Sequence, residues 1–158
     1  MPAPAMNRVV KDFKAAATGE QTVQLKALRG KQVVLYFYPK DNTPGCTNES
    51  IDFAALYPKF KRANTVVFGI SRDSIASHEK FKAKYEMPFD LLSDADEKLC
   101  SQFDVIKEKN MYGKKVMGIE RSTFLIDADG KLRQEWRKVK VKEHANAVLD
   151  AAKALNKG

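Results

Sequence analysis

Cys46 is one of two cysteines in the 158-residue chain, and it directly follows the Thr-Pro-Gly turn at residues 43–45. The pattern of a buried strand ends before this turn, and a helical pattern begins at or near the cysteine. The first amides of a helix lack partners within the helix, and the helix dipole favours negative charge there. A thiol reacts as its thiolate. The position therefore indicates a nucleophile, against the more usual interpretation of a free cysteine as a small core residue.

Several neighbours of Cys46 could assist the sulfur. Thr43 can present a hydroxyl three residues ahead of it, and Pro44 and Gly45 allow a close approach without covering the thiol. Glu49 is at the spacing expected for a residue that caps the first turn of the helix. An arginine brought close by the fold would stabilise the thiolate further.

The composition is basic, with 28 Lys and Arg against 20 Asp and Glu and a formal net charge of +8. The charges are mixed along the chain, which indicates a solvated surface and no nucleic-acid partner. Residues 137–142 form the densest basic stretch, and their alternation with valine predicts an edge strand protected by lysines. No CxxC, zinc-ligand spacing, signal-peptide pattern or apolar run of about 20 residues occurs. We therefore expect a cytoplasmic protein that does not bind membranes.

The apolar patterning predicts one α/β domain over residues 1–158, with a loosely ordered tail at residues 1–6 and irregular structure up to residue 20. Strands and helices alternate, which predicts a central mixed β-sheet flanked by helices on both faces. In such sheets the chemistry lies at the carboxyl ends of strands, where Cys46 is placed. The expected elements are strands at 32–38, 65–71 and 90–94, a hairpin at 122–139, and helices from Cys46 (kinked or restarted at Pro58), from Ser74 to before Pro88, at 96–103 and at 143–157.

Pro39, Thr43 and Cys46 in PKDNTPGC match the PxxxTxxC motif of the peroxiredoxins. The wider stretch LYFYPKDNTPGCTNES resembles the bacterioferritin comigratory protein, or peroxiredoxin Q, subfamily, as do SRDSIASHEKF, PFDLLSD and KKVMGIERSTFLID. The resemblance extends over nearly the whole chain. It implies a thioredoxin-like fold and the reduction of hydrogen peroxide and organic hydroperoxides by a thiol, without a metal or other cofactor.

The resemblance also implies a role for each matching residue. Cys46 would be the peroxidatic nucleophile, which attacks the peroxide and becomes a sulfenic acid. Thr43 would hydrogen-bond the peroxide and the thiolate, and Pro39 would shield the pocket from water. Arg121 would hold the thiolate and polarise the peroxide. Without the resemblance, Arg121 would be interpreted as a strand-edge ion pair with a carboxylate such as Glu49, and the two interpretations are compatible because Glu49 could position Arg121.

The sulfenic acid must then be reduced by a second thiol. In members of this subfamily the resolving cysteine lies at the position of Ile51 or of Lys82, and neither is a cysteine here. Cys100 lies in an apolar segment, which favours a buried and inert thiol over the alternative of a resolving one. We therefore favour a monomeric enzyme with a one-cysteine mechanism, in which thioredoxin, glutaredoxin or a small thiol reduces Cys46.

Three other functions fit the sequence less well. A thiol–disulfide oxidoreductase needs a CxxC motif, which the chain lacks. A glutathione-peroxidase-type enzyme needs a tryptophan near the nucleophile, whereas Trp136 lies in the late hairpin. A non-enzymatic peroxide sensor would relay the oxidation of Cys46 to a partner. His78 and His144 are expected at surface or capping positions, without a catalytic role.

Overall fold

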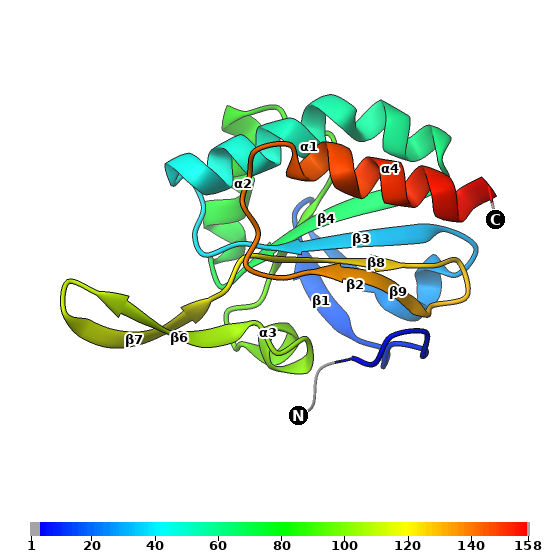
Figure 1. Ribbon diagram of the computed structural model, residues 1–158. Coiled ribbons are helices and arrows are strands. Elements are labelled where there is room, and N and C mark those ends of the chain that lie inside the picture. The colour runs from blue at the N-terminus through cyan, green and yellow to red at the C-terminus, as the bar shows by residue number, and fades with distance from the viewer. Residues whose placement is uncertain (1–3, 158) are drawn as a thin grey trace.

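The computed structural model describes residues 4–157, apart from the side chain of residue 111. The chain forms a layered α/β structure (Figure 1). Its elements are β1 (Lys14–Ala17), β2 (Gln21–Gln24), the 3-10 helix η1 (Leu25–Leu28), β3 (Gln32–Phe37), α1 (Pro44–Arg62), β4 (Thr65–Ser71), α2 (Ile75–Lys84), β5 (Leu91–Ser93), α3 (Lys98–Gln102), β6 (Ile106–Met111), β7 (Lys114–Ile119), β8 (Ser122–Ile126), β9 (Leu132–Trp136) and α4 (His144–Lys157).

Seven strands form the central sheet, in the order β2-β1-β5-β4-β3-β8-β9. β4 is parallel to both of its neighbours, β3 and β5, and the remaining pairs are antiparallel. α1 and α4 lie on one face of the sheet, and α3 lies on the other (Figure 1). The predicted mixed sheet with helices on both faces is therefore confirmed.

β3 lies in the middle of the sheet, and all six of its residues are buried. Successive side chains of a strand point to opposite faces. Val33, Leu35 and Phe37 therefore enter a first core with η1 and α3. Val34 and Tyr36 enter a second core with α1, α2 and α4. The central sheet separates these two cores.

α1 begins after Thr43, with Pro44 at its first position, and it continues without a restart through Pro58. Proline has no amide to donate to the preceding turn, so a break was expected there. Phe53 and Phe60 are both fully buried in the second core, on either side of the proline. Their packing holds the two halves of the helix against the sheet and outweighs the lost hydrogen bond.

Two sequence predictions about secondary structure are wrong. Residues 14–17 form β1 instead of irregular chain, because they pair with both β2 and β5. Residues 137–142 are irregular and do not form an edge strand. The guanidinium of Arg137 donates to the carbonyls of Phe103 and Asp104, which draws this segment away from the ladder of β9.

The structure also contains a hairpin that the sequence patterns did not predict. β6 and β7 pair only with each other and project from the body of the molecule (Figure 1). Their turn has φ angles of 53° at Tyr112 and 79° at Gly113. Positive φ at both central residues is typical of tight hairpin turns. β7 leads directly to residues 120–121, which precede β8.

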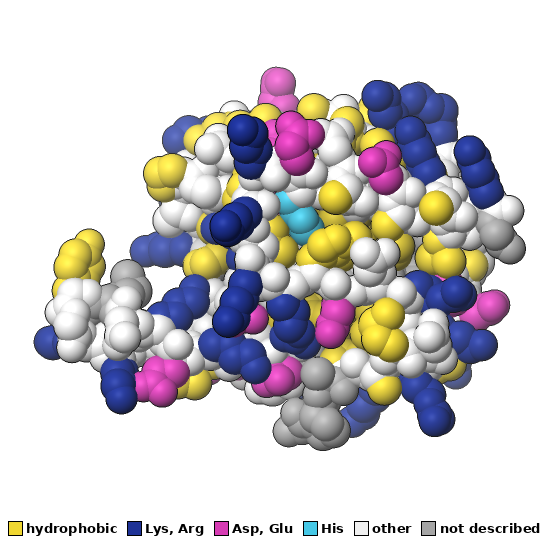
Figure 2. Space-filling model, in the orientation of Figure 1, with side chains coloured by type: hydrophobic (Ala, Val, Ile, Leu, Met, Phe, Trp, Pro, Cys, Tyr) yellow, Lys and Arg dark blue, Asp and Glu magenta, His cyan; other side chains and the backbone are white. Residues whose placement is uncertain are grey.

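The ends and the surface complete the description. Of the tail predicted at residues 1–6, residues 1–3 lie outside the described part, and Ala5 accepts a hydrogen bond from the amide of Arg8. No helix within residues 4–157 is long and apolar enough to cross a membrane. On the face shown in Figure 2, Lys and Arg side chains are widely spread with Asp and Glu among them, as the mixed charge pattern indicated.

Gly69 in β4 is expected to be essential for packing. A Cβ at this position would lie 2.6 Å from the Tyr36 hydroxyl and 2.8 Å from a methyl carbon of Leu91. Both side chains are fully buried, so Gly69→Ala should lower the free energy of unfolding in urea by about 2 kcal/mol or more. Gly118→Ala is the control, because its Cβ would meet only Lys109 at 3.5 Å. Equal stability of the two variants would contradict the prediction.

Candidate active site

Cys46 is the third residue of α1, beyond the carboxyl end of β3, and it is 1% exposed. The first hydrogen bond of α1 runs from the amide of Thr47 to the carbonyl of Thr43. The amides of Gly45 and Cys46 therefore precede the helical ladder. The sulfur lies at the end of the helix where the dipole favours negative charge.

Arg121 approaches Cys46 from the segment between β7 and β8. Its Nη2 donates to Sγ of Cys46 at 3.4 Å, and its Nη1 donates to Oε1 of Glu49 at 2.6 Å. A Cβ on Gly45 would lie 3.2 Å from Nη2, so the glycine leaves room for the guanidinium. Burial acts to lower the pKa of Arg121, but Glu49 and Cys46 outweigh it and raise that pKa. A permanent cation is thereby fixed beside the thiol.

Glu49 lies one turn beyond Cys46 on α1 and is 1% exposed. The prediction that it caps the first turn of the helix is wrong, because its carboxylate pairs with Arg121 instead. Its second oxygen, Oε2, has no hydrogen-bond partner among the described residues. Burial raises the pKa of Glu49 to about 7, and the attraction of Arg121 offsets burial only in part. Arg121 thus lies between two groups that are stabilised by its charge.

Thr43 and Pro39 flank the loop that leads into α1, and both are half-buried. The hydroxyl of Thr43 donates to the carbonyl of Lys40 at 2.9 Å. A hydroxyl has one proton and two lone pairs. Thr43 therefore offers only acceptor positions to a further partner, so in this arrangement its hydroxyl cannot also donate to Cys46.

Cys100 lies in the first core, whereas Cys46 lies in the second, on the opposite face of the sheet. Burial raises the pKa of the Cys100 thiol far above its ordinary value, and the neighbouring carboxylate of Asp94 adds to the effect. At the two other positions considered for a resolving thiol, Ile51 is exposed and Lys82 forms an ion pair with Asp90 at 2.7 Å.

The histidines were expected at surface or capping positions, and this is wrong for His78, which is fully buried inside α2. His144 is the first residue of α4, but it is only 6% exposed and so does not lie at the surface. His144 shares a hydrogen bond of 2.8 Å with the hydroxyl of Thr123, and its pKa is lowered to about 4 by burial and then by the charge of Arg121. The signal was present in the sequence, since residues 144, 145, 148, 149 and 152 form one stripe of α4.

Lys109 is a neighbour of the site that sequence reasoning missed. It extends from β6, and its Nζ donates to the carbonyl of Ile119. Burial lowers the pKa of Lys109, and the charge of Arg121 lowers it further. No local pattern could reveal this lysine, because the hairpin alone brings it near the guanidinium.

These features define a class of protein. A buried thiol at the positive end of a helix, with a guanidinium fixed 3.4 Å from its sulfur, is suited to act as a thiolate nucleophile. Within residues 4–157 no group of three His, Cys, Asp or Glu residues could hold a metal ion. The fold and the site therefore define a protein suited to thiolate chemistry.

Comparison with known proteins identifies the family. The model of the AhpC/TSA family matches residues 6–135. Peroxiredoxin Bcp of Xanthomonas campestris pv. campestris is 56% identical over 143 residues, which cover 90% of this chain and 89% of that protein. A mutant structure of PrxQ from Xylella fastidiosa has a TM-score of 0.92 at 43% identity and covers 98% of both chains.

A further structure concerns the alkyl peroxide reduction activity of the Xanthomonas campestris bacterioferritin comigratory protein. It is 54% identical, has a TM-score of 0.87, and covers 91% of this chain and 92% of that one. The chain belongs to the AhpC/TSA family, and within it to the bacterioferritin comigratory, or Q-type, peroxiredoxins. The predicted thioredoxin-like fold and thiol-dependent peroxidase activity are confirmed.

The raised pKa of Glu49 predicts a pH-dependent stability. The folded state holds the proton up to about pH 7, whereas the unfolded chain releases it near 4.5. Protonation therefore stabilises the fold below pH 4.5, and about 3 kcal/mol of this is lost as pH rises to 7. Glu49→Gln should lack this loss when urea unfolding is compared across the interval. Glu20→Gln, which changes an exposed carboxylate, should retain the loss of stability. If the free energy of unfolding depends on pH in the same way in the wild type and both variants, the prediction is wrong.

Proposed function

We propose that Cys46 is the peroxidatic nucleophile and that this single domain reduces hydrogen peroxide and organic hydroperoxides. The thiolate attacks the terminal oxygen of the peroxide. A sulfur–oxygen bond forms and the oxygen–oxygen bond breaks, so the sulfur becomes a sulfenic acid. The departing oxygen takes up a proton and leaves as water or an alcohol. The observation that carries this proposal is the 3.4 Å contact between Cys46 and Arg121 at the start of α1.

Arg121 is proposed to stabilise the transition state. Negative charge moves from the sulfur to the leaving oxygen, and a fixed guanidinium beside the sulfur can stabilise it without rearrangement. Glu49 holds the other edge of the guanidinium at 2.6 Å and would therefore position Arg121. The hydroxyl oxygen of Thr43 would accept a hydrogen bond from the O–H of the bound hydroperoxide, and Pro39 would limit the access of water.

A one-cysteine mechanism follows from the positions of the two thiols. Cys100 lies in the core on the other face of the sheet, and a disulfide requires Cα atoms within about 7 Å. An external thiol would therefore attack the sulfenic acid of Cys46, release water and form a mixed disulfide. A second external thiol would then restore Cys46 and leave as the oxidised reductant. We expect thioredoxin, glutaredoxin or a small thiol in this role, with the enzyme acting as a cytoplasmic monomer.

Oxidation by one equivalent of peroxide tests this route. We expect Cys46 to accumulate as a sulfenic acid that dimedone traps, because no second thiol lies in the same core. The product is read by mass spectrometry without reduction. Cys100→Ser should behave like the wild type, whereas Cys46→Ser should lose turnover with every thiol reductant. A quantitative disulfide between the two cysteines of one chain would overturn the one-cysteine mechanism.

Substitution of Arg121 tests the electrostatic role. Arg121→Gln should lower the second-order rate constant of Cys46 with hydrogen peroxide by roughly 10²- to 10³-fold, as the loss of one fixed donor typically does. Arg133→Gln is a matched control, since Arg133 also pairs with a carboxylate, Asp127, at 3.2 Å. Comparable rates for the two variants would remove Arg121 from the mechanism.

A further inference from the structure

A buried ion pair joins α2 to the loop before Cys46. His78 is fully buried, and its Nδ1 lies 2.7 Å from Oδ2 of Asp41. Its Nε2 lies 2.9 Å from the carbonyl oxygen of Leu92. The catalytic roles proposed above do not involve this pair, although Asp41 belongs to the active-site loop, residues 39–43. Removal of one partner from a buried pair is strongly destabilising. We therefore ask what the His78–Asp41 pair does at the active-site loop.

The partners of His78 define its state. A carbonyl can only accept hydrogen bonds, and the Asp41 carboxylate also accepts from the hydroxyls of Tyr38 at 2.6 Å and Ser77 at 2.8 Å. Burial acts to raise the pKa of Asp41, but the hydrogen bonds from His78 and Tyr38 outweigh it, so the pKa is lowered. Each ring nitrogen of His78 therefore lies within hydrogen-bond distance of an oxygen acceptor, so the ring is held on both sides.

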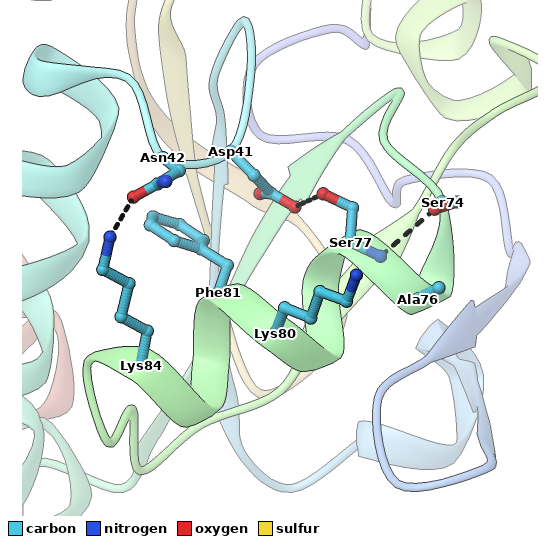
Figure 3. Close-up of a pocket in the computed structure, with 8 residues that line it drawn as sticks. All are labelled: Asp41, Asn42, Ser74, Ala76, Ser77, Lys80, Phe81 and Lys84. Carbon is cyan, nitrogen blue, oxygen red and sulfur yellow. Dashed lines mark hydrogen bonds between the residues drawn. The ribbon is translucent and has the colours of Figure 1, made fainter.

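The same helix also holds the next residue of the loop. The side-chain oxygen of Asn42 accepts from Nζ of Lys84 at 3.3 Å and from the hydroxyl of Tyr85 at 3.2 Å. Figure 3 shows α2 reaching the loop at two points, with Ser77 bonded to Asp41 and Lys84 bonded to Asn42. In addition, the backbone amide of Asp41 donates to Asp73, just before α2, at 2.8 Å.

These contacts lie between two residues of the active site. Asp41 is two positions after Pro39 and two before Thr43, whose own hydroxyl bonds back to Lys40. Asn42 has a φ of 62°, so the chain turns sharply there. Displacement of Asp41 would therefore move Thr43, which is the residue that precedes α1, relative to Cys46.

We propose that His78 and Asp41 are positioning residues for peroxide reduction, because their ion pair anchors the active-site loop to α2 and so fixes Pro39 and Thr43 against Cys46. This inference rests on the role proposed for Cys46. Neither residue touches the sulfur, and both act through the loop. A misplacement of about 1 Å at a reacting group can cost 10²-fold in rate, so the effect is measurable.

The rate of sulfenic acid formation tests the proposal. His78→Gln can donate to one of the two acceptors but not to both, so the loop should lose its anchor. We expect the second-order rate constant of Cys46 with hydrogen peroxide to fall by about 10- to 100-fold. Alkylation of the 1% exposed Cys46 by iodoacetamide should become faster, because the loop no longer holds its place. Both rates are read by mass spectrometry at a temperature where each variant is folded.

If His78→Gln does not fold, two milder variants test the same positioning role. Tyr38→Phe and Ser77→Ala each remove a single hydroxyl from Asp41 and should lower the rate constant by a smaller factor in the same direction. In the double variant Asp41→Asn/His78→Gln, the rate constant should fall by less than the product of the two single-variant factors, because both changes break the same pair.

Leu132→Ala separates positioning from simple loss of stability. Leu132 is fully buried in the first core, on the face of the sheet opposite Cys46, so its truncation should destabilise the fold without moving the loop. The proposal expects this control to keep the wild-type rate constant and alkylation rate. If Leu132→Ala matches His78→Gln in both rates, or if His78→Gln matches the wild type, the positioning role is wrong.

Failure of the role proposed for Cys46 can be distinguished from failure of the positioning role alone. If wild-type Cys46 forms no sulfenic acid with peroxide, the role proposed for Cys46 fails and the positioning role fails with it. If the wild type reacts and His78→Gln, Tyr38→Phe and Ser77→Ala all react at the same rate, only the positioning role is overturned.

Discussion

The structure depends on a guanidinium held between a thiol and a carboxylate. Arg121 carries a charge into a site where Cys46 and Glu49 are each 1% exposed, and such a charge is tolerated only when it is paired. Its two contacts differ in function: the ion pair with Glu49 fixes the plane of the guanidinium, and the remaining nitrogen reaches the sulfur. Gly45 suits the same arrangement, because a Cβ there would lie 3.2 Å from Nη2.

The central sheet determines which chemistry is available to the thiol. β3 is buried on both faces, so a packed layer of side chains lies between the two cores of the protein. Cys46 shares its core with α1, α2 and α4, whereas Cys100 shares the other with α3. The long distance in the sequence between the cysteines is thus matched by a physical barrier. In the proposed one-cysteine mechanism, an oxidised Cys46 would therefore be reduced from the solvent by a thiol of another molecule.

Local patterns predicted the parts of the fold and site that depend on neighbours in sequence. The buried strands, the start of a helix near Cys46 and the position of Cys46 after a strand follow from such patterns. Glu49 was assigned both as a helix cap and as a possible partner of Arg121, and only the second assignment holds, because Arg121, 72 positions away, takes the carboxylate. The burial of His78 was missed because it depends on a partner that is distant in the sequence. Asp41, 37 positions earlier, supplies the charge that makes this burial tolerable. The β6–β7 hairpin was missed because Ile106 and Ile119 at its base pack against the first core, whereas residues 114–117 of β7 are exposed, so the hairpin has no strong apolar pattern.

Two requirements act on the loop before α1 and oppose each other. In the proposed mechanism, a small peroxide would need Pro39, Thr43 and Cys46 in a fixed arrangement, which the contacts from α2 would provide. A reducing thiol is larger, and Cys46 at 1% exposure offers it almost no surface. Reduction of the proposed sulfenic acid would therefore require a local opening, whose free energy is set by the contacts that open. The anchors on Asp41 and Asn42 would thus have to be strong enough to hold the loop for the first step and weak enough to release it for the second. A buried ion pair surrounded by single hydrogen bonds at an otherwise half-exposed loop meets both requirements, because it fixes one geometry without adding apolar area that would have to be exposed on opening.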